Sequence, residues 1–112
     1  MKSNVAPIGD LESDEEIAQL ADLFRLMGDP TRLRIIIACL AAPINVGDIA
    51  TRLELSPSLV SHHLRLLRAA RVLRAERRGK QIFYSALDRH IQTVIDDMVT
   101  HVGEPVGIED VD

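Results

Sequence analysis

Cysteine, long apolar runs and net positive charge are scarce or missing in this sequence. The single cysteine, Cys39, cannot form an internal disulfide or supply the paired thiolates of a cysteine-rich metal or redox site. It lies within the apolar run 35–40, so we predict that it is a core residue. No apolar run approaches the roughly 20 residues that cross a bilayer, and residues 1–10 lack the layout of a signal peptide. We therefore expect a cytoplasmic protein without a membrane partner.

The lack of net positive charge would argue against a nucleic-acid ligand if the charge were evenly spread. The formal charge is −4 at pH 7, but residues 51–80 hold eight Lys and Arg against two acidic residues. Residues 1–22 and 81–112 are strongly acidic. Because phosphate contacts depend on the local field, the basic middle segment can still bind DNA. Charge alone leaves open the alternative of a solvated basic face.

The length of 112 residues favours one compact domain, since it is too short for two separate cores. We predict this domain over residues 13–104, between a flexible N-terminal arm at 1–12 and a flexible C-terminal tail at 105–112. Capping residues predict five helices within it, which begin after Ser13, Asp29, Asn45, Ser56 and Asp88. The third and fourth helices are close in sequence and predict a helix-turn-helix.

Apolar residues give the first and last predicted helices one apolar face each. The first helix carries Ile17, Leu20, Ala21 and Phe24, and the last carries Ile91, Val94, Ile95, Met98, Val99 and Val102 before Gly103 and Pro105 stop it. Between them, strand formers at 72–77 and 81–86 flank Arg78-Gly79, which suits a tight hairpin turn. The predicted fold is therefore mainly α with a β-hairpin wing, a winged helix-turn-helix.

The helix that starts at Pro57 has the features of a DNA-reading helix. Val60, Leu64 and Leu67 form one stripe that must face the core. The other side carries short hydroxyls, one imidazole and cations, which can reach base edges and phosphates: Ser58, Ser61, His62, Arg65 and Arg68. The hairpin adds Arg74, Arg77, Arg78 and Lys80. A polar helix face alone is usually just solvated, but a helix-turn-helix followed by a basic hairpin favours DNA binding.

Three further segments occur in order along the chain: MGDPTRLRI at 27–35, LSPSLVSHHL at 55–64 followed by Leu67-Arg68, and GKQIFY at 79–84. With these segments the chain resembles the ArsR/SmtB family of metal-responsive repressors. The resemblance spans roughly residues 15–104. It implies a dimer with winged helix-turn-helix arms, and Pro57, Ser58, Ser61 and His62 fall where the family's DNA-contacting residues lie.

The last helix also carries a possible metal-binding set, Asp88-x-His90 and His101-x-x-Glu104. The two histidines share a helix face but lie about 16 Å apart along the axis, too far for ligands of one ion. Two such helices, antiparallel across a two-fold axis, can form two equivalent sites. Each site would combine one subunit's Asp88 and His90 with the partner subunit's His101 and Glu104, a set suited to tetrahedral zinc or cobalt. The resemblance supports this, because the SmtB-like branch has an interfacial zinc site of matching residue types and spacing.

Each of these four residues also has a simpler interpretation when taken alone. Asp88 can be only an N-cap, Glu104 only a helix-end carboxylate, and a lone His is more often a surface or packing residue.

The cysteine sites of the arsenic, lead and cadmium branches are missing here, and residues 45–48 read NVGD instead. Nickel sensing in the family adds ligands from the chain ends, where this chain has no histidine.

These patterns together predict a repressor that binds operator DNA with an inverted repeat as a homodimer and dissociates on binding zinc or cobalt. One alternative is a winged-helix repressor that answers to a signal other than a metal. A second, a small metal-dependent hydrolase, is disfavoured because a catalytic zinc keeps an open coordination position. Four protein ligands on a helix-helix seam would leave none.

Overall fold

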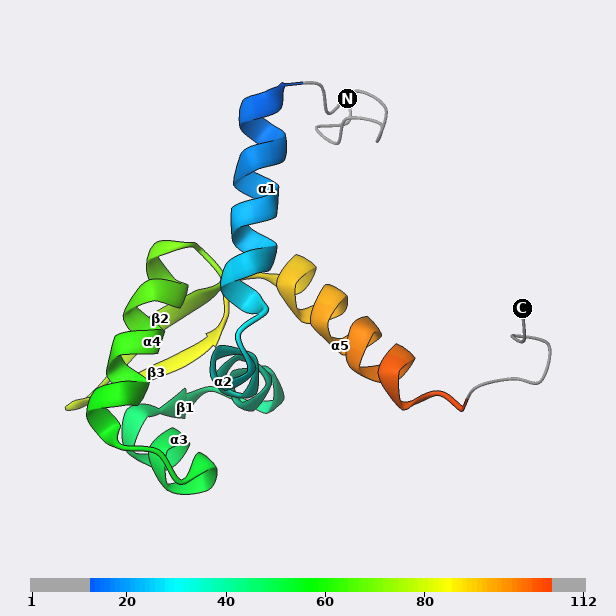
Figure 1. Ribbon diagram of the computed structural model, residues 1–112. Coiled ribbons are helices and arrows are strands. Elements are labelled where there is room, and N and C mark those ends of the chain that lie inside the picture. Colours follow the sequence, from blue (N-terminus) through cyan, green and yellow to red (C-terminus); the bar gives the residue numbers. More distant parts are fainter. Residues whose placement is uncertain (1–12, 106–112) are drawn as a thin grey trace, which may run out of the picture.

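The computed structural model describes residues 13–105, so the predicted arm at 1–12 and all but Pro105 of the predicted tail lie outside the described residues (Figure 1). The elements in chain order are α1 (Asp14–Met27), α2 (Pro30–Ala41), β1 (Ile44–Asn45), α3 (Val46–Leu53), α4 (Pro57–Ala69), β2 (Leu73–Arg78), β3 (Gln81–Ala86) and α5 (Arg89–Gly103). None of the described helices is both long enough and apolar enough to span a bilayer.

All five helices begin at the capping residues that the sequence predicts. The side chains of Ser13, Asp29, Asn45, Ser56 and Asp88 each accept a hydrogen bond from a backbone N–H two or three residues later. At α1, the Ser13 hydroxyl accepts from the Glu16 backbone N–H at 2.9 Å and donates to the Glu16 carboxylate at 3.0 Å. Each such cap contributes about 1 kcal/mol by satisfying a donor that the helix leaves free.

The predicted hairpin is confirmed, but its turn is shifted by one residue. Arg78 pairs with Gln81 as the last rung of the β2–β3 ladder, so Gly79 and Lys80 form the two-residue turn. Gly79 has φ of +65°, a value that suits glycine and the tight turns of two-residue hairpins. The predicted turn at Arg78-Gly79 is therefore wrong, because Arg78 still belongs to the strand.

The sheet also has a third strand that the sequence analysis does not predict. β1 contains only two residues and pairs antiparallel with β3, with Ile44 opposite Tyr84 and Asn45 opposite Phe83. The strand order is β1-β3-β2. This pairing holds the start of α3 against the wing, so the sheet connects the helix-turn-helix to the wing.

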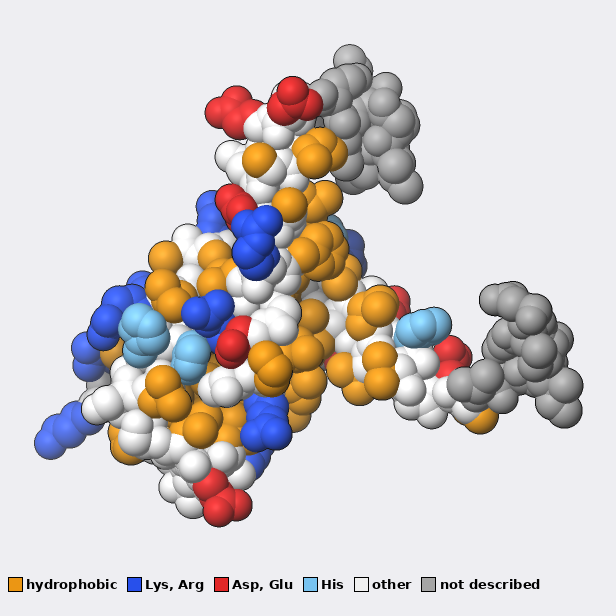
Figure 2. All heavy atoms as spheres, viewed as in Figure 1, with side chains coloured by type: hydrophobic (Ala, Val, Ile, Leu, Met, Phe, Trp, Pro, Cys, Tyr) orange, Lys and Arg blue, Asp and Glu red, His pale blue; other side chains and the backbone are white. Residues whose placement is uncertain are grey.

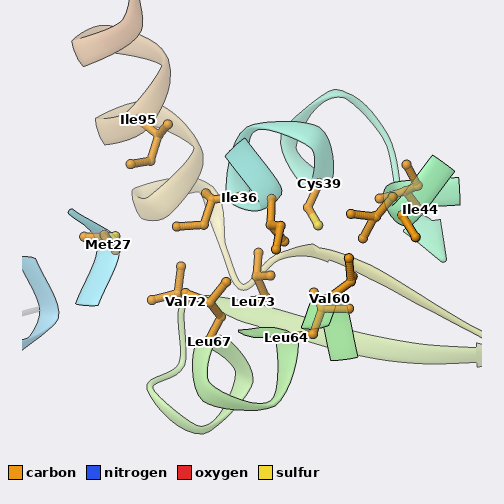
Figure 3. Packing of buried hydrophobic residues seen from close by; sticks show 13 residues of the cluster. Met27, Ile36, Cys39, Ile44, Val60, Leu64, Leu67, Val72, Leu73 and Ile95 are labelled. Carbon is orange, nitrogen blue, oxygen red and sulfur yellow. The ribbon is translucent and has the colours of Figure 1, made fainter. Parts of the chain in front are cut away.

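One hydrophobic core lies between α2, α3, α4 and the sheet, which together form what we call the body (residues 30–86). Figure 3 shows Ile36, Leu64, Leu67 and Leu73 converging there, with Ile95 reaching toward them from α5. Cys39 is 1% exposed, which confirms the prediction that it is a core residue. Burial raises the pKa of its thiol to about 12, so the thiol stays protonated and unreactive.

Helices α1 and α5, which we call the terminal helices, project away from the body in different directions (Figure 1). Their large apolar side chains are largely exposed to solvent: Ile17, Leu20 and Phe24 on α1, and Val94, Met98, Val99 and Val102 on α5. Figure 2 shows hydrophobic side chains along both helices. An apolar hollow of about 290 Å³ separates α5 from α2 and is lined by Leu33, Ile37, Ile95, Met98, Val99 and Val102.

Candidate DNA interface and metal ligands

Helix α4 presents its two faces as predicted. Val60, Leu64 and Leu67 are at most 1% exposed and pack α4 against the hydrophobic core. The opposite side of α4 is accessible, and the predicted DNA-contacting residues lie there: Pro57, Ser58, His62 and Arg65 are exposed, and Ser61 is half-buried. The motif around it is a helix-turn-helix, since α3 packs against α4 and Glu54 ends α3 in the left-handed conformation. The N-terminal half of α4 therefore carries small polar groups at the surface, as a reading helix requires.

Ser61 lies at the edge of a hollow between α4 and the wing. This hollow has a volume of about 420 Å³ and is lined by Asn45, Val46, Gly47, Ser61, Lys80, Gln81, Ile82 and Tyr84. The polar lining residues Asn45, Gln81 and Tyr84 are not among the predicted DNA-contacting residues. They reach the hollow because β1 pairs with β3, a contact between residues about forty positions apart that no local pattern signals.

The basic residues of the wing are not equivalent to one another. Arg77 and Lys80 are exposed and make no ion pair among the described residues. Arg78 instead donates to the Glu76 carboxylate at 3.1 Å and lies over the Phe83 ring at 5.0 Å from its centroid. A cation held by a carboxylate and a ring is less available to a phosphate than a free one. Arg77 and Lys80 are thus better placed than Arg78 to contact DNA.

The two adjacent histidines of α4 have different environments. His62 is exposed, whereas His63 is only 9% exposed and faces the body. The Nδ1 atom of His63 accepts a hydrogen bond from Nε of Arg32 on α2 at 3.2 Å. Burial lowers the pKa of His63, and the neighbouring Arg32 guanidinium lowers it further. His63 is therefore a neutral packing histidine rather than a DNA-reading residue.

The four predicted metal ligands lie as two pairs at opposite ends of α5. At the start, His90 Nδ1 is 3.4 Å from Asp88 Oδ2; at the end, His101 Nδ1 is 3.5 Å from Glu104 Oε1. All four side chains are exposed. Within residues 13–105, no three His, Cys, Asp or Glu side chains of one chain are grouped so that they could hold a metal ion.

Asp88 can serve as a cap and keep an oxygen free for a ligand. Its Oδ1 accepts from the backbone N–H groups of His90 and Ile91 at 3.0 and 3.2 Å, and Oδ2 takes no part in capping. The Ile91 backbone hydrogen bond lowers the pKa of the Asp88 carboxyl, which keeps it ionised. Imidazole nitrogen and carboxylate oxygen are both ligands that zinc accepts. The donor chemistry therefore fits zinc, but each end of α5 offers only half of a tetrahedral set.

Comparison with known proteins identifies the family. The family model for bacterial regulatory proteins of the arsR family matches residues 29–75. A transcriptional repressor SmtB homolog from Synechocystis is 33% identical over 90 residues, which cover 80% of this chain and 68% of that protein. The regulator NmtR of Mycobacterium tuberculosis is 33% identical over 95 residues, 85% of this chain and 78% of the relative.

Solved structures have a similar fold. The crystal structure of NolR from Sinorhizobium fredii matches with a TM-score of 0.73 and 27% identity, over 90% of this chain and all of that one. The homodimeric winged helix-turn-helix DNA-binding domain Mb0332 from Mycobacterium bovis matches with a TM-score of 0.74 and 20% identity, over 92% of this chain and 94% of that one, and confirms the predicted winged helix-turn-helix fold. The hydrolase alternative is excluded because the relatives named above are regulators rather than enzymes. On the match to the family model and the identity to these two relatives, the chain belongs to the ArsR family of bacterial DNA-binding transcriptional regulators.

Proposed function

We propose that this protein is a cytoplasmic, metal-responsive transcriptional repressor that binds an inverted-repeat operator as a homodimer and releases it on binding zinc or cobalt. The observation that carries the proposal is the arrangement of α5. It has a pair of metal-type donors at each end and an exposed apolar face between them. Within residues 13–105 neither pair of donors is a complete metal site, and antiparallel pairing with a second copy would complete two sites and cover the apolar face.

The terminal helices support a dimer because several of their large apolar side chains are left exposed by the described residues 13–105. Phe24 of α1 and Met98 of α5 are more than half exposed, and Val102 is 80% exposed. Contiguous apolar surface of this kind is uncommon in monomers and marks an interaction site. A second copy of the chain is the occupant we favour, since reading an inverted repeat requires a two-fold symmetric protein.

Pairing α5 with its two-fold mate would bring complementary donors together. The start of one helix would lie beside the end of the other, so Asp88 and His90 would meet the partner subunit's His101 and Glu104. The four exposed side chains need no rearrangement of the core to turn toward each other. When bound, the ion would supply a cross-link between the subunits at two symmetric places.

The path from α5 to the DNA-reading face is short. The Leu87 backbone N–H donates to the Val72 carbonyl at 2.9 Å, so the junction of β3 and α5 is tied to the segment before β2. Gln92 on α5 also donates to the Leu40 carbonyl at the end of α2 at 3.4 Å. A change in the angle between the two α5 helices would therefore move each body, and with it the spacing of the two α4 helices. Two-fold reading of DNA tolerates little change in that spacing.

The residue types favour zinc or cobalt over thiolate-seeking metals. The proposed set contains two nitrogens and two carboxylate oxygens, and the chain's single thiol is buried in the core. Soft metals select thiolates, whereas imidazole and carboxylate suit zinc and cobalt in tetrahedral geometry. We therefore expect cobalt to give the visible absorption of a tetrahedral N/O site, at one ion per subunit.

Mixed dimers test the crossing of ligands between subunits. Subunits with His90→Ala are combined with subunits with His101→Ala, and cobalt capacity is measured by absorption. If the sites are composite, one site loses both histidines and the other keeps all four ligands, so half of the wild-type capacity survives. Capacity near zero would mean that each site is built within one subunit. A wild-type dimer that binds DNA but gives no cobalt spectrum would favour a repressor with a non-metal signal.

A further inference from the structure

A partly buried polar link joins the end of α1 to the inner face of the DNA-reading helix. Its centre is Arg32 in the first turn of α2. The Arg32 Nε donates to His63 Nδ1 at 3.2 Å, and its Nη1 donates to the Leu26 carbonyl in the last turn of α1 at 3.4 Å. Its backbone N–H donates to the capping carboxylate of Asp29 at 3.0 Å. One guanidinium thus bridges a terminal helix and α4.

The direction of the Arg32–His63 hydrogen bond fixes the state of the imidazole. An arginine side chain can only donate, so the Nδ1 of His63 must be unprotonated and its proton must sit on Nε2. Protonation would place a second donor at 3.2 Å from the guanidinium and replace a hydrogen bond with a repulsion between two cations. The link therefore exists only while His63 is neutral.

We infer that Arg32 is a positioning residue for the DNA-reading helix and that the neutral His63 is the part of the link that acid can break. This inference rests on the proposed DNA-binding function. Val60, Leu64 and Leu67 hold α4 against the hydrophobic core by apolar contacts, which are non-directional. The Arg32–His63 bond adds a directional constraint midway along α4, next to the exposed His62.

The charges around His63 set the direction of the pH effect. Arg32 on α2 and His62 on α4 oppose protonation, whereas the Asp29 carboxylate at the start of α2 favours it. Burial and Arg32 prevail, so the pKa of His63 is lower in the folded protein than its ordinary value of about 6.5. The link then contributes fully above about pH 6.5, and it is lost as the pH falls through the lowered pKa of His63 in the folded protein.

The test compares the wild-type dimer with His63→Gln, whose side-chain oxygen can accept from Arg32 and cannot titrate. The probe is a DNA fragment selected from a random-sequence pool by the wild-type protein, with chelator present, over pH 7.5 to 5.5. At pH 7.5 the two proteins should bind alike. As the pH falls through the lowered pKa of His63, we expect the wild type to weaken relative to His63→Gln, up to about tenfold once His63 is protonated, the loss typical of one hydrogen bond to a charged group. His62 is present in both proteins, so its contribution cancels from the ratio.

A second pair of variants tests Arg32 directly. Arg32→Met keeps the apolar stem and removes both donors, and Arg34→Met is the control because Arg34 is exposed on the same helix. We expect Arg32→Met to lose DNA affinity together with the part of the pH dependence that separates the wild type from His63→Gln, without loss of dimerisation. Arg34→Met should change neither the pH dependence nor the dimerisation. Nitrogen NMR of the wild type should show His63 with a bare Nδ1 at pH 7.5.

The experiments distinguish failure of the positioning role, failure of the acid sensitivity and failure of the proposed DNA-binding function. A proton on Nδ1 at pH 7.5, or wild-type affinity and pH response in Arg32→Met, would overturn the positioning role of Arg32. Parallel pH curves for the wild type and His63→Gln would overturn the acid sensitivity. If the wild type selects no DNA from the pool, the proposed function itself fails and the positioning role fails with it, whatever the NMR result.

Discussion

The body and the terminal helices bury their apolar side chains by different means. In the body, Ile35, Ile36, Ile49 and Val60 are fully buried by contacts within one chain. In α5, Ile95 belongs to that core and Ile91 packs against it, whereas Val94, Met98, Val99 and Val102 remain open to solvent. The body therefore has a core made by contacts of its own chain, whereas we expect a second copy to cover the terminal helices. The proposed function divides along the same line, with the proposed DNA contacts on the body and the proposed metal ligands on α5.

The largest effect should come from breaking the core of the body. Leu67→Ala removes a fully buried side chain from α4 and should lower the free energy of unfolding by about 2–5 kcal/mol through lost transfer energy and the cavity left behind. Leu59→Ala on the same helix, where the side chain is 40% exposed, is the matched control and should cost much less. Urea denaturation at one fixed protein concentration measures both. Equal losses in the free energy of unfolding would mean that α4 does not pack against the core through the face that contains Leu67.

Breaking the terminal helices should instead separate the subunits and leave the body folded. Met98→Glu places a charge on the exposed apolar face of α5 and should weaken dimerisation at least about 100-fold, because the interface cannot desolvate that charge. Thr93→Glu adds the same charge on the polar side of α5 and should have little effect. Sedimentation velocity gives the oligomeric state, and circular dichroism reports the fold. A Met98→Glu protein that stays dimeric would remove α5 from the interface.

A third change affects the reading face of the body without touching the terminal helices. Replacing Ser61 and His62 together by Ala should weaken binding to selected DNA by about 10- to 100-fold, given the 1–3 kcal/mol typical of a base contact. Dimerisation and cobalt binding should be unchanged. Fluorescence anisotropy with selected and random DNA measures the loss, which should be larger for the selected fragment. Unchanged affinity would mean that α4 is not the reader.

The smallest effects are expected at the wing. Arg77→Gln and Lys80→Gln should each weaken selected and random DNA alike and reduce the slope of log affinity against log salt by about 1, as a lost phosphate contact does. Arg78→Gln should have less effect, because Glu76 and Phe83 already hold the Arg78 guanidinium. Salt titrations of the three variants rank them. A larger loss at Arg78 than at Arg77 would show that the cation leaves its strand contacts to meet DNA.

Local chemistry made much of the body predictable. Every helix start followed from a capping residue, and Asp29-Pro30 and Ser56-Pro57 are strong signals because Pro suits the first helical position. The wing turn was misplaced by one residue because Gly79 fits either of two adjacent turns, and cross-strand pairing decided between them. Strand β1 was missed because two residues carry no period, and their partners in β3 lie far along the chain.

The candidate sites were less predictable where they depend on contacts between distant residues. The inner position of His63 could have been found from its spacing, since it lies three residues after Val60 and four before Leu67 on the buried stripe. The hydrogen bond between Arg32 and His63 could not be predicted, because the two residues are 31 positions apart in the sequence. The donor pairs at the two ends of α5 could be predicted because the members of each pair are close in sequence. A complete site that combines one pair with the other needs a second chain, and a single chain cannot show it.

The coupling between metal and DNA tests the central claim most directly. Zinc is titrated into the complex of the dimer with selected DNA, and DNA is titrated into the zinc-loaded dimer. We predict that zinc weakens DNA binding by at least the factor of about 5 to 150 typical of allosteric proteins, and that DNA weakens zinc binding by the same factor. In variants of Asp88, His90, His101 or Glu104, DNA should bind as in the wild type without any response to zinc. If zinc binds tightly while the DNA affinity stays the same or rises, release of the operator by metal is contradicted.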